Sequence, residues 1–160
     1  LPSELEMIRQ RAHLIPEPMR EKLLCAKPIE FRPVVGEDPF NPAVSDPIKY
    51  VWFRADGTLP GTPARQKYLV AYASEGGLRT TSLLPHGKGV WQKDMQVASL
   101  DHALWFHADL RADDWLLYAM DSPWAGNSRG FSRGSVYNRA GQLVASVTQE
   151  GLIRHRKDWA

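Results

Sequence analysis

The clearest hydrophobic pattern lies near the C-terminal end of the sequence. Between residues 142 and 154, Leu143, Ala145, Val147 and Ile153 fall on one face of an extended segment, and the opposite row is more polar. This alternation predicts a half-buried β-strand. Three earlier segments are also typical of strands, namely 95–107, 115–122 and 129–137.

One long helix is predicted before these strands. Thr62 followed by Pro63 is typical of a helix start, and Gly76-Gly77 is a strong stop signal. The second half of the segment 62–74 is apolar on every side, which predicts a buried helix. A β-rich segment at 48–54 precedes it. An antiparallel sheet wrapped around one central helix is an α+β fold.

Proline separates the first 47 residues from the rest, because eight of the 12 prolines lie there. Ser3 and Glu6 fit the capping box of one short helix, and 28–32 could form an edge strand. We expect the remainder to be extended, since proline fixes φ and removes a backbone donor. The predicted division is a linker arm at 1–47 and a folded domain at 48–160.

Composition narrows the function classes. The formal net charge of +2 is too balanced for a protein that coats nucleic acid. The single Cys25 excludes an intrachain disulfide framework, and the five histidines show no metal-ligand spacing, so we expect no metal site. No stretch approaches the roughly 18 apolar residues of a spanning helix, so we expect no membrane segment. We expect a cytoplasmic protein, or a peroxisomal one in a eukaryote. Because Leu1 is not Met, we expect a processed chain or a fragment.

Three polar residues break their local patterns. Gln149 lies in the apolar row of the last strand and should point inward; a structural amide bonded to backbone is the other interpretation. Glu75 lies at the C-terminal end of the predicted helix, where the helix dipole disfavours a carboxylate. It is either a solvated side chain at a frayed helix end or a carboxylate held in a cleft. Ser99 and Asp101 interrupt an apolar row that includes Ala103 and Trp105, which predicts a polar pocket floor or a bulge.

Two motifs are set aside. Residues 130–134 match the Gly-x-Ser-x-Gly nucleophile elbow, but strand character continues after them where that motif needs a helix. Asp101 and His102 are neighbours in a predicted strand, so their side chains point to opposite faces and need not meet.

Several segments together resemble the C-terminal half of the acyl-CoA thioesterase II family. They are 28–33, 51–54, 84–87, 99–107, 115–118, 129–130 and 144–151. The match covers nearly the whole chain in order, which makes it far more specific than any one motif. The resemblance implies the second repeat of a double hotdog protein that hydrolyses acyl-CoA, together with the inter-repeat linker.

The resemblance also implies a site. The family's catalytic Asp, Thr and Gln fall on Glu75, Ser99 and Gln149 of this sequence. Glu75 would be a general base for water, and Ser99 would position that water. The longer Glu could be a compensated feature or a damaged version of the family site. The alternative function is a non-catalytic acyl-CoA-binding or structural repeat. Expected partners are acyl-CoA, an N-terminal hotdog repeat and further copies of the protein. Coenzyme A would enter as part of the substrate, so we expect no cofactor.

Overall fold

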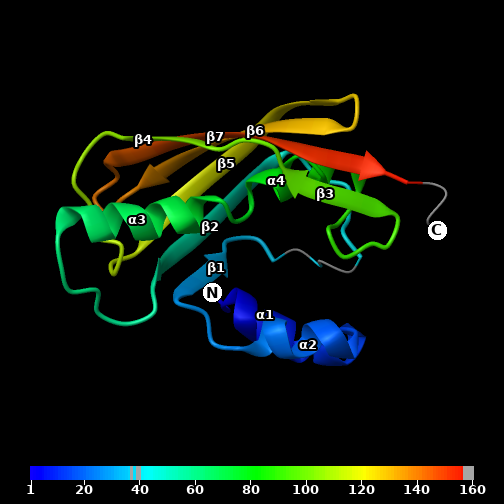
Figure 1. The fold of residues 1–160 in the computed structure, drawn as a ribbon, viewed down its shortest axis with the longest axis horizontal. Helices are drawn as coiled ribbons and strands as arrows, with labels where there is room; N and C mark the ends of the chain where they lie inside the picture. The colour runs from blue at the N-terminus through cyan, green and yellow to red at the C-terminus, as the bar shows by residue number, and fades with distance from the viewer. Residues whose placement is uncertain (37, 39–40, 157–160) are drawn as a thin grey trace.

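A computed structural model describes residues 1–36, 38 and 41–156 (Figure 1). The helices are α1 (Glu4–Gln10), η1 (Ala12–Leu14), α2 (Glu17–Leu24), α3 (Pro63–Ser74), α4 (Leu78–Thr81) and η2 (Leu84–His86). The strands are β1 (Ile29–Pro33), β2 (Ile48–Ala55), β3 (Met95–Ser99), β4 (Ala103–Phe106), β5 (Leu116–Gly126), β6 (Arg129–Tyr137) and β7 (Leu143–His155).

All strands belong to one antiparallel sheet with the order β1-β2-β5-β6-β7-β3. Strand β4 also pairs with β7, beside residues 145–148, whereas β3 lies beside residues 151–155. The central strands β5, β6 and β7 are the longest. They form the floor on which α3 lies (Figure 1). The predicted α+β arrangement of a curved sheet with one central helix is confirmed.

The prediction of one strand over 95–107 is wrong, because the strand is interrupted at 100–102. The N–H groups of Leu100 and Asp101 both point to the carbonyl of Glu150, and the Asp101 carboxylate accepts from the Glu150 N–H at 2.7 Å. Consequently the register slips by one between the pairs Ser99–Gly151 and Ala103–Thr148. After the slip, Leu104 and Phe106 pack against the core, while Trp105, predicted to share the face of Ser99, is 52% exposed.

Only one side of α3 is buried. Val70 and Ala73 are inaccessible and belong to the core, and Leu69 is partly buried against it. Tyr68 and Tyr72 are each 70% exposed, so the expectation of burial on every side is wrong. The sheet covers one face of the helix, and within the described residues nothing covers the other.

The core is assembled between α3 and the inner row of the sheet. Its most completely buried apolar side chains are Phe53, Val70, Leu78, Leu116, Tyr118, Val136, Val144 and Val147. The rings of Phe53 and Tyr118 meet edge to face with centroids 6.1 Å apart. This arrangement is favourable beyond simple burial of area, because the positive ring edge meets the negative ring face.

The first 47 residues are less extended than expected. Helix α1 begins at the predicted capping box, in which Ser3 and Glu6 bond to each other's backbone N–H. The extended interpretation is wrong for α2, because Pro16 precedes that helix and Pro18 lies in its first turn, where a missing N–H costs nothing. The predicted edge strand is confirmed as β1.

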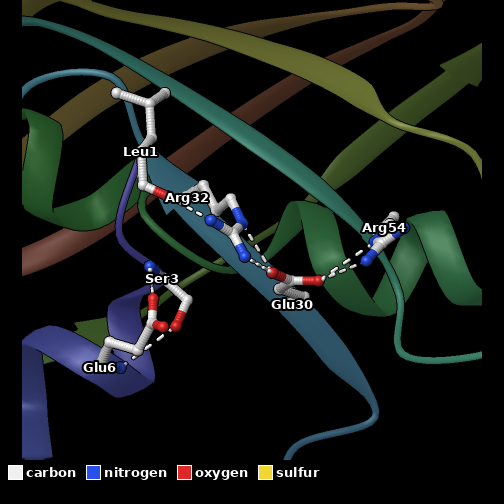
Figure 2. Close-up of polar contacts among 6 residues, drawn as sticks. All are labelled: Leu1, Ser3, Glu6, Glu30, Arg32 and Arg54. Carbon is white, nitrogen blue, oxygen red and sulfur yellow. Dashed lines mark hydrogen bonds and ion pairs between the residues drawn. The ribbon is translucent and has the colours of Figure 1, made fainter.

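A polar cluster connects the N-terminus, β1 and β2 on the outer face of the sheet (Figure 2). Arg32 Nε donates to Glu30 at 2.6 Å, Arg54 Nη2 donates to it at 3.0 Å, and Arg32 also donates to the carbonyl of Leu1. Burial acts to raise the pKa of Glu30, but the bonds from the two arginines outweigh it and lower that pKa.

The predicted division of the chain into an arm at 1–47 and a domain at 48–160 stays a prediction. Residues 157–160 of the predicted domain lie outside the described residues.

Gly134 on β6 permits the close packing of Tyr118. A Cβ atom at position 134 would lie 2.8 Å from Tyr118 Cζ and would overlap the ring edge more severely still. We therefore expect Gly134→Ala to lower the free energy of unfolding by about 1–3 kcal/mol, the usual range for overpacking. Urea denaturation of the full-length protein measures this change.

Gly36→Ala is the matched control, because a Cβ there would meet only Met7 Sδ at an ordinary 3.7 Å. The control should change the unfolding free energy by no more than about 0.5 kcal/mol. Equal stability of the two variants would contradict the packing described for Gly134.

Candidate functional site

The three predicted site residues converge on one carboxylate oxygen. Glu75 follows the last residue of α3, Ser99 ends β3, and Gln149 lies in β7. The Ser99 hydroxyl donates to Glu75 Oε1, and Gln149 Nε2 donates to the same oxygen at 3.3 Å. Residues 24 and 74 positions apart in the chain are thus in direct contact, which only the tertiary fold can achieve.

Gln149 points inward as predicted, and its residue is 1% exposed. Its amide oxygen is buried and accepts no hydrogen bond from any described residue. A flipped amide would place that oxygen against the Glu75 carboxylate, so the orientation with Nε2 toward Glu75 is the favourable one. The site therefore contains a buried acceptor in need of a donor, and an unsatisfied acceptor of this kind costs about 1–3 kcal/mol.

Glu75 is accessible from one side. Its side chain is 42% exposed, and every hydrogen bond described for the carboxylate goes to Oε1. A carboxylate at the C-terminal end of a helix faces the negative end of the helix dipole, which is unfavourable. Three donors on Oε1 offset this disadvantage and leave Oε2 without a protein donor among the described residues.

The third donor is Arg79, which the sequence interpretation missed. Arg79 Nη1 lies 3.1 Å from Glu75 Oε1 and 2.9 Å from Ser99 Oγ. The glycine pair 76–77 indicated the end of helical structure, but Gly77 adopts a left-handed φ of 91° and the short helix α4 begins directly after it. The available signal was the spacing of four residues between a Glu and an Arg, which brings such side chains together on a helix.

The end of α3 is fixed by hydrogen bonds to two neighbouring segments. The hydroxyl of Tyr118 donates to the carbonyl of Ser74 at 2.8 Å, and Ser74 Oγ lies 2.9 Å from His102 Nε2. Burial, and secondarily the charge of Glu75, raise the pKa of Tyr118, so the phenol stays protonated and can donate. These contacts place the residue after Ser74, which is Glu75, over β3 and β7.

The two motifs set aside in the sequence have other roles. Ser132 of the Gly-x-Ser-x-Gly match lies inside β6 with 1% exposure, and no helix follows it. Asp101 bonds to the Glu150 N–H and His102 to Ser74, so they serve different partners. Neither motif forms a nucleophile or an acid–base pair here.

Two kinds of feature are absent from the described part of the chain. Within residues 1–36, 38 and 41–156, no group of three or more His, Cys, Asp or Glu side chains is arranged to hold a metal ion. In the same residues, no helix is long and apolar enough to cross a membrane.

Comparison with known proteins agrees with the resemblance seen in the sequence. The sequence model of the family described as acyl-CoA thioesterase matches residues 18–152. Acyl-CoA thioesterase 2 of Haemophilus influenzae is 38% identical over 148 residues, which are 92% of this chain and 52% of that protein. Human acyl-coenzyme A thioesterase 8 is 40% identical over 129 residues, covering 79% of this chain and 40% of that protein.

Solved structures agree with the fold. The crystal structure of acyl-CoA thioesterase II TesB2 from Mycobacterium marinum has a TM-score of 0.68 at 34% identity, and covers 82% of this chain and 51% of that chain. A protein described as having the hot dog fold, from Alicyclobacillus acidocaldarius, has a TM-score of 0.60 at 17% identity, which supports the fold alone. The expected hotdog fold is thereby confirmed. The chain spans about half the length of the relatives it matches. With most of its residues matched by one family and its fold shared with that family's structures, the chain belongs to the acyl-CoA thioesterase family.

Proposed function

We propose that the protein hydrolyses acyl-CoA thioesters to free fatty acid and coenzyme A at Glu75, Ser99 and Gln149. The observation that carries this proposal is the convergence of Ser99 and Gln149 on Glu75 Oε1, with Glu75 Oε2 and the amide oxygen of Gln149 left for a ligand. Membership of the acyl-CoA thioesterase family supports the choice of substrate class.

The chemistry starts from one water molecule in this site. The water would donate one hydrogen to Glu75 Oε2 and the other to the amide oxygen of Gln149, which satisfies the buried acceptor. Its oxygen then attacks the thioester carbonyl carbon while Glu75 takes a proton as general base. Collapse of the tetrahedral intermediate breaks the C–S bond, and the proton held by Glu75 passes to the departing sulfur. The products are a fatty acid and coenzyme A.

Ser99 positions rather than attacks in this mechanism. Its hydroxyl hydrogen is directed to Glu75, and no described histidine bonds to it. His102, the histidine nearest to Ser99 in the sequence, bonds to Ser74 instead. A serine nucleophile needs a base that removes its proton during attack, and a hydroxyl already engaged with the general base of the water is poorly suited to that role. Coenzyme A enters only as part of the substrate.

The alternative is a repeat that binds acyl-CoA, or supports an active partner, without hydrolysis. The ion pair between Glu75 and Arg79 favours this second function, because it occupies a carboxylate oxygen that could otherwise accept a proton from water. Release of free thiol from acyl-CoAs of several chain lengths distinguishes the two functions. Binding of acyl-CoA without thiol release would support the alternative.

We also propose an N-terminal hotdog repeat as a partner, together with association of further copies. Two observations support this, namely the match to about half of each relative and the exposure of Tyr68 and Tyr72 on α3. Exposed aromatic side chains are enriched where proteins associate. We propose a cytoplasmic location, or a peroxisomal one in a eukaryote.

Removal of the Gln149 amide tests its role in holding water. We expect Gln149→Ala to lower kcat by about 100-fold, a typical loss for one polar group at a reacting centre. Folding should be nearly unchanged, since the variant also removes a buried unpaired oxygen. Steady-state kinetics of the full-length protein with acyl-CoA, together with thermal denaturation, measure both effects.

Gln96→Ala is the matched control, because Gln96 lies in β3 and also has a buried, unpartnered amide oxygen but has no described contact with Glu75. Equal activity of the Gln149 and Gln96 variants would contradict the role of Gln149.

The length of the Glu75 side chain is a second test. Three donors meet Oε1 where a Glu side chain places it, so we expect Glu75→Asp to lower kcat by about 100-fold, the cost of a displacement near 1 Å. Glu150→Asp, on the opposite face of β7, should leave the rate unchanged. An increase in rate for Glu75→Asp would indicate instead that the glutamate is a damaged version of the family site.

A further inference from the structure

Arg79 bonds to both Glu75 and Ser99 through a single nitrogen. Nη1 donates to Glu75 Oε1 and to Ser99 Oγ, and these two residues come from the end of α3 and the end of β3. The aliphatic stem of Arg79 lies near Gly151 of β7, since a Cβ atom added at Gly151 would lie 3.6 Å from Arg79 Cβ. One side chain on α4 therefore bonds to residues at the ends of α3 and β3 and lies next to β7.

The stability gained from this ion pair is small. The side chains of Arg79 and Glu75 are 34% and 42% exposed, and ion pairs at such solvent-screened positions contribute little to the free energy of unfolding. The effect of Arg79 on the orientation of the Glu75 carboxylate is larger, because hydrogen bonds to charged groups are directional. Catalysis is sensitive to displacements near 1 Å. The position of Arg79 is thus better explained by geometry than by stability.

The direction of the hydrogen bonds gives Arg79 a defined task. Nη1 occupies a lone pair of Ser99 Oγ, so the single hydroxyl hydrogen of Ser99 is turned toward Glu75. The guanidinium and the hydroxyl then hold Oε1 together, and the carboxylate can no longer rotate freely. Oε2 is fixed on the side where it can face the water.

We propose that Arg79 is a positioning residue for hydrolysis, which orients the Glu75 carboxylate and the Ser99 hydroxyl without contacting the substrate. This inference rests on the proposed function of the same site. It also assigns a reason to the glutamate at position 75, because the longer side chain reaches an arginine on the following helix α4.

Variants at position 79 test the proposal in the full-length protein. Arg79→Met keeps the packing stem and removes the donors, so kcat should fall about 100-fold with little change in KM. Arg79→Lys retains a charge but not the planar fork, so it should recover only part of that loss. Arg79→Ala should regain activity when methylguanidine is added, an effect that a purely structural role would not produce.

The action through Glu75 has its own measurement. Arg79→Met combined with Glu75→Gln should be no slower than Glu75→Gln alone, because a positioning residue has nothing to act on once the base is gone. Arg133→Met is the matched control, since Arg133 forms a comparable ion pair with Asp121 on the outer face of the sheet. This control should retain the unmodified rate.

The outcomes separate the two proposals. A normal kcat for Arg79→Met, with hydrolysis abolished by Glu75→Gln, would overturn the role of Arg79 and leave the proposed function intact. Loss of activity in proportion to loss of thermal stability, without methylguanidine rescue, would also overturn it. Absence of thiol release from every acyl-CoA by the unmodified protein, or full activity of Glu75→Gln, would overturn both proposals.

Discussion

The hydrogen bond from the Tyr118 hydroxyl to the Ser74 carbonyl fixes the end of α3 against the sheet. A helix leaves its last carbonyls without intrahelical partners, and here β5 supplies a donor for one of them. The donor is dependable because burial keeps the phenol protonated. Gly134 leaves room for the Tyr118 ring, and Phe53 packs against that ring in an edge-to-face contact. The position of Glu75, one residue further on, follows from these contacts.

Much of the fold could be predicted because it depends on short-range sequence patterns. The alternation along β7 placed Gln149 on the inner face, and the proline after Thr62 placed the start of α3. The capping box at Ser3 placed α1. Each of these depends on residues that are neighbours in sequence, where backbone and side-chain preferences act directly.

The parts that could not be predicted depend on distant residues. The interruption of the edge strand at 100–102 requires the Asp101 carboxylate to meet a backbone N–H of β7, 49 positions away. The open face bearing Tyr68 and Tyr72 depends on what lies against α3, about which an apolar pattern contains no information. Arg79 was missed because a glycine pair predicts a stop, while the backbone at Gly77 uses its left-handed freedom to begin another helix. The contact of Glu75, Ser99 and Gln149 was anticipated only through the family resemblance.

The interrupted edge of the folded sheet limits how other chains can pair with it. Beyond β7 the sheet ends in two short strands of 5 and 4 residues, separated by a backbone slip that turns Asp101 onto Glu150. A long, flat strand at this edge would offer a continuous row of free N–H and C=O groups to any other extended chain. Two short strands in different registers can each form only a few hydrogen bonds with another chain. Aggregation by strand pairing at this edge is therefore disfavoured. The backbone slip at 100–102 therefore shortens the stretch of sheet edge that another chain could pair with.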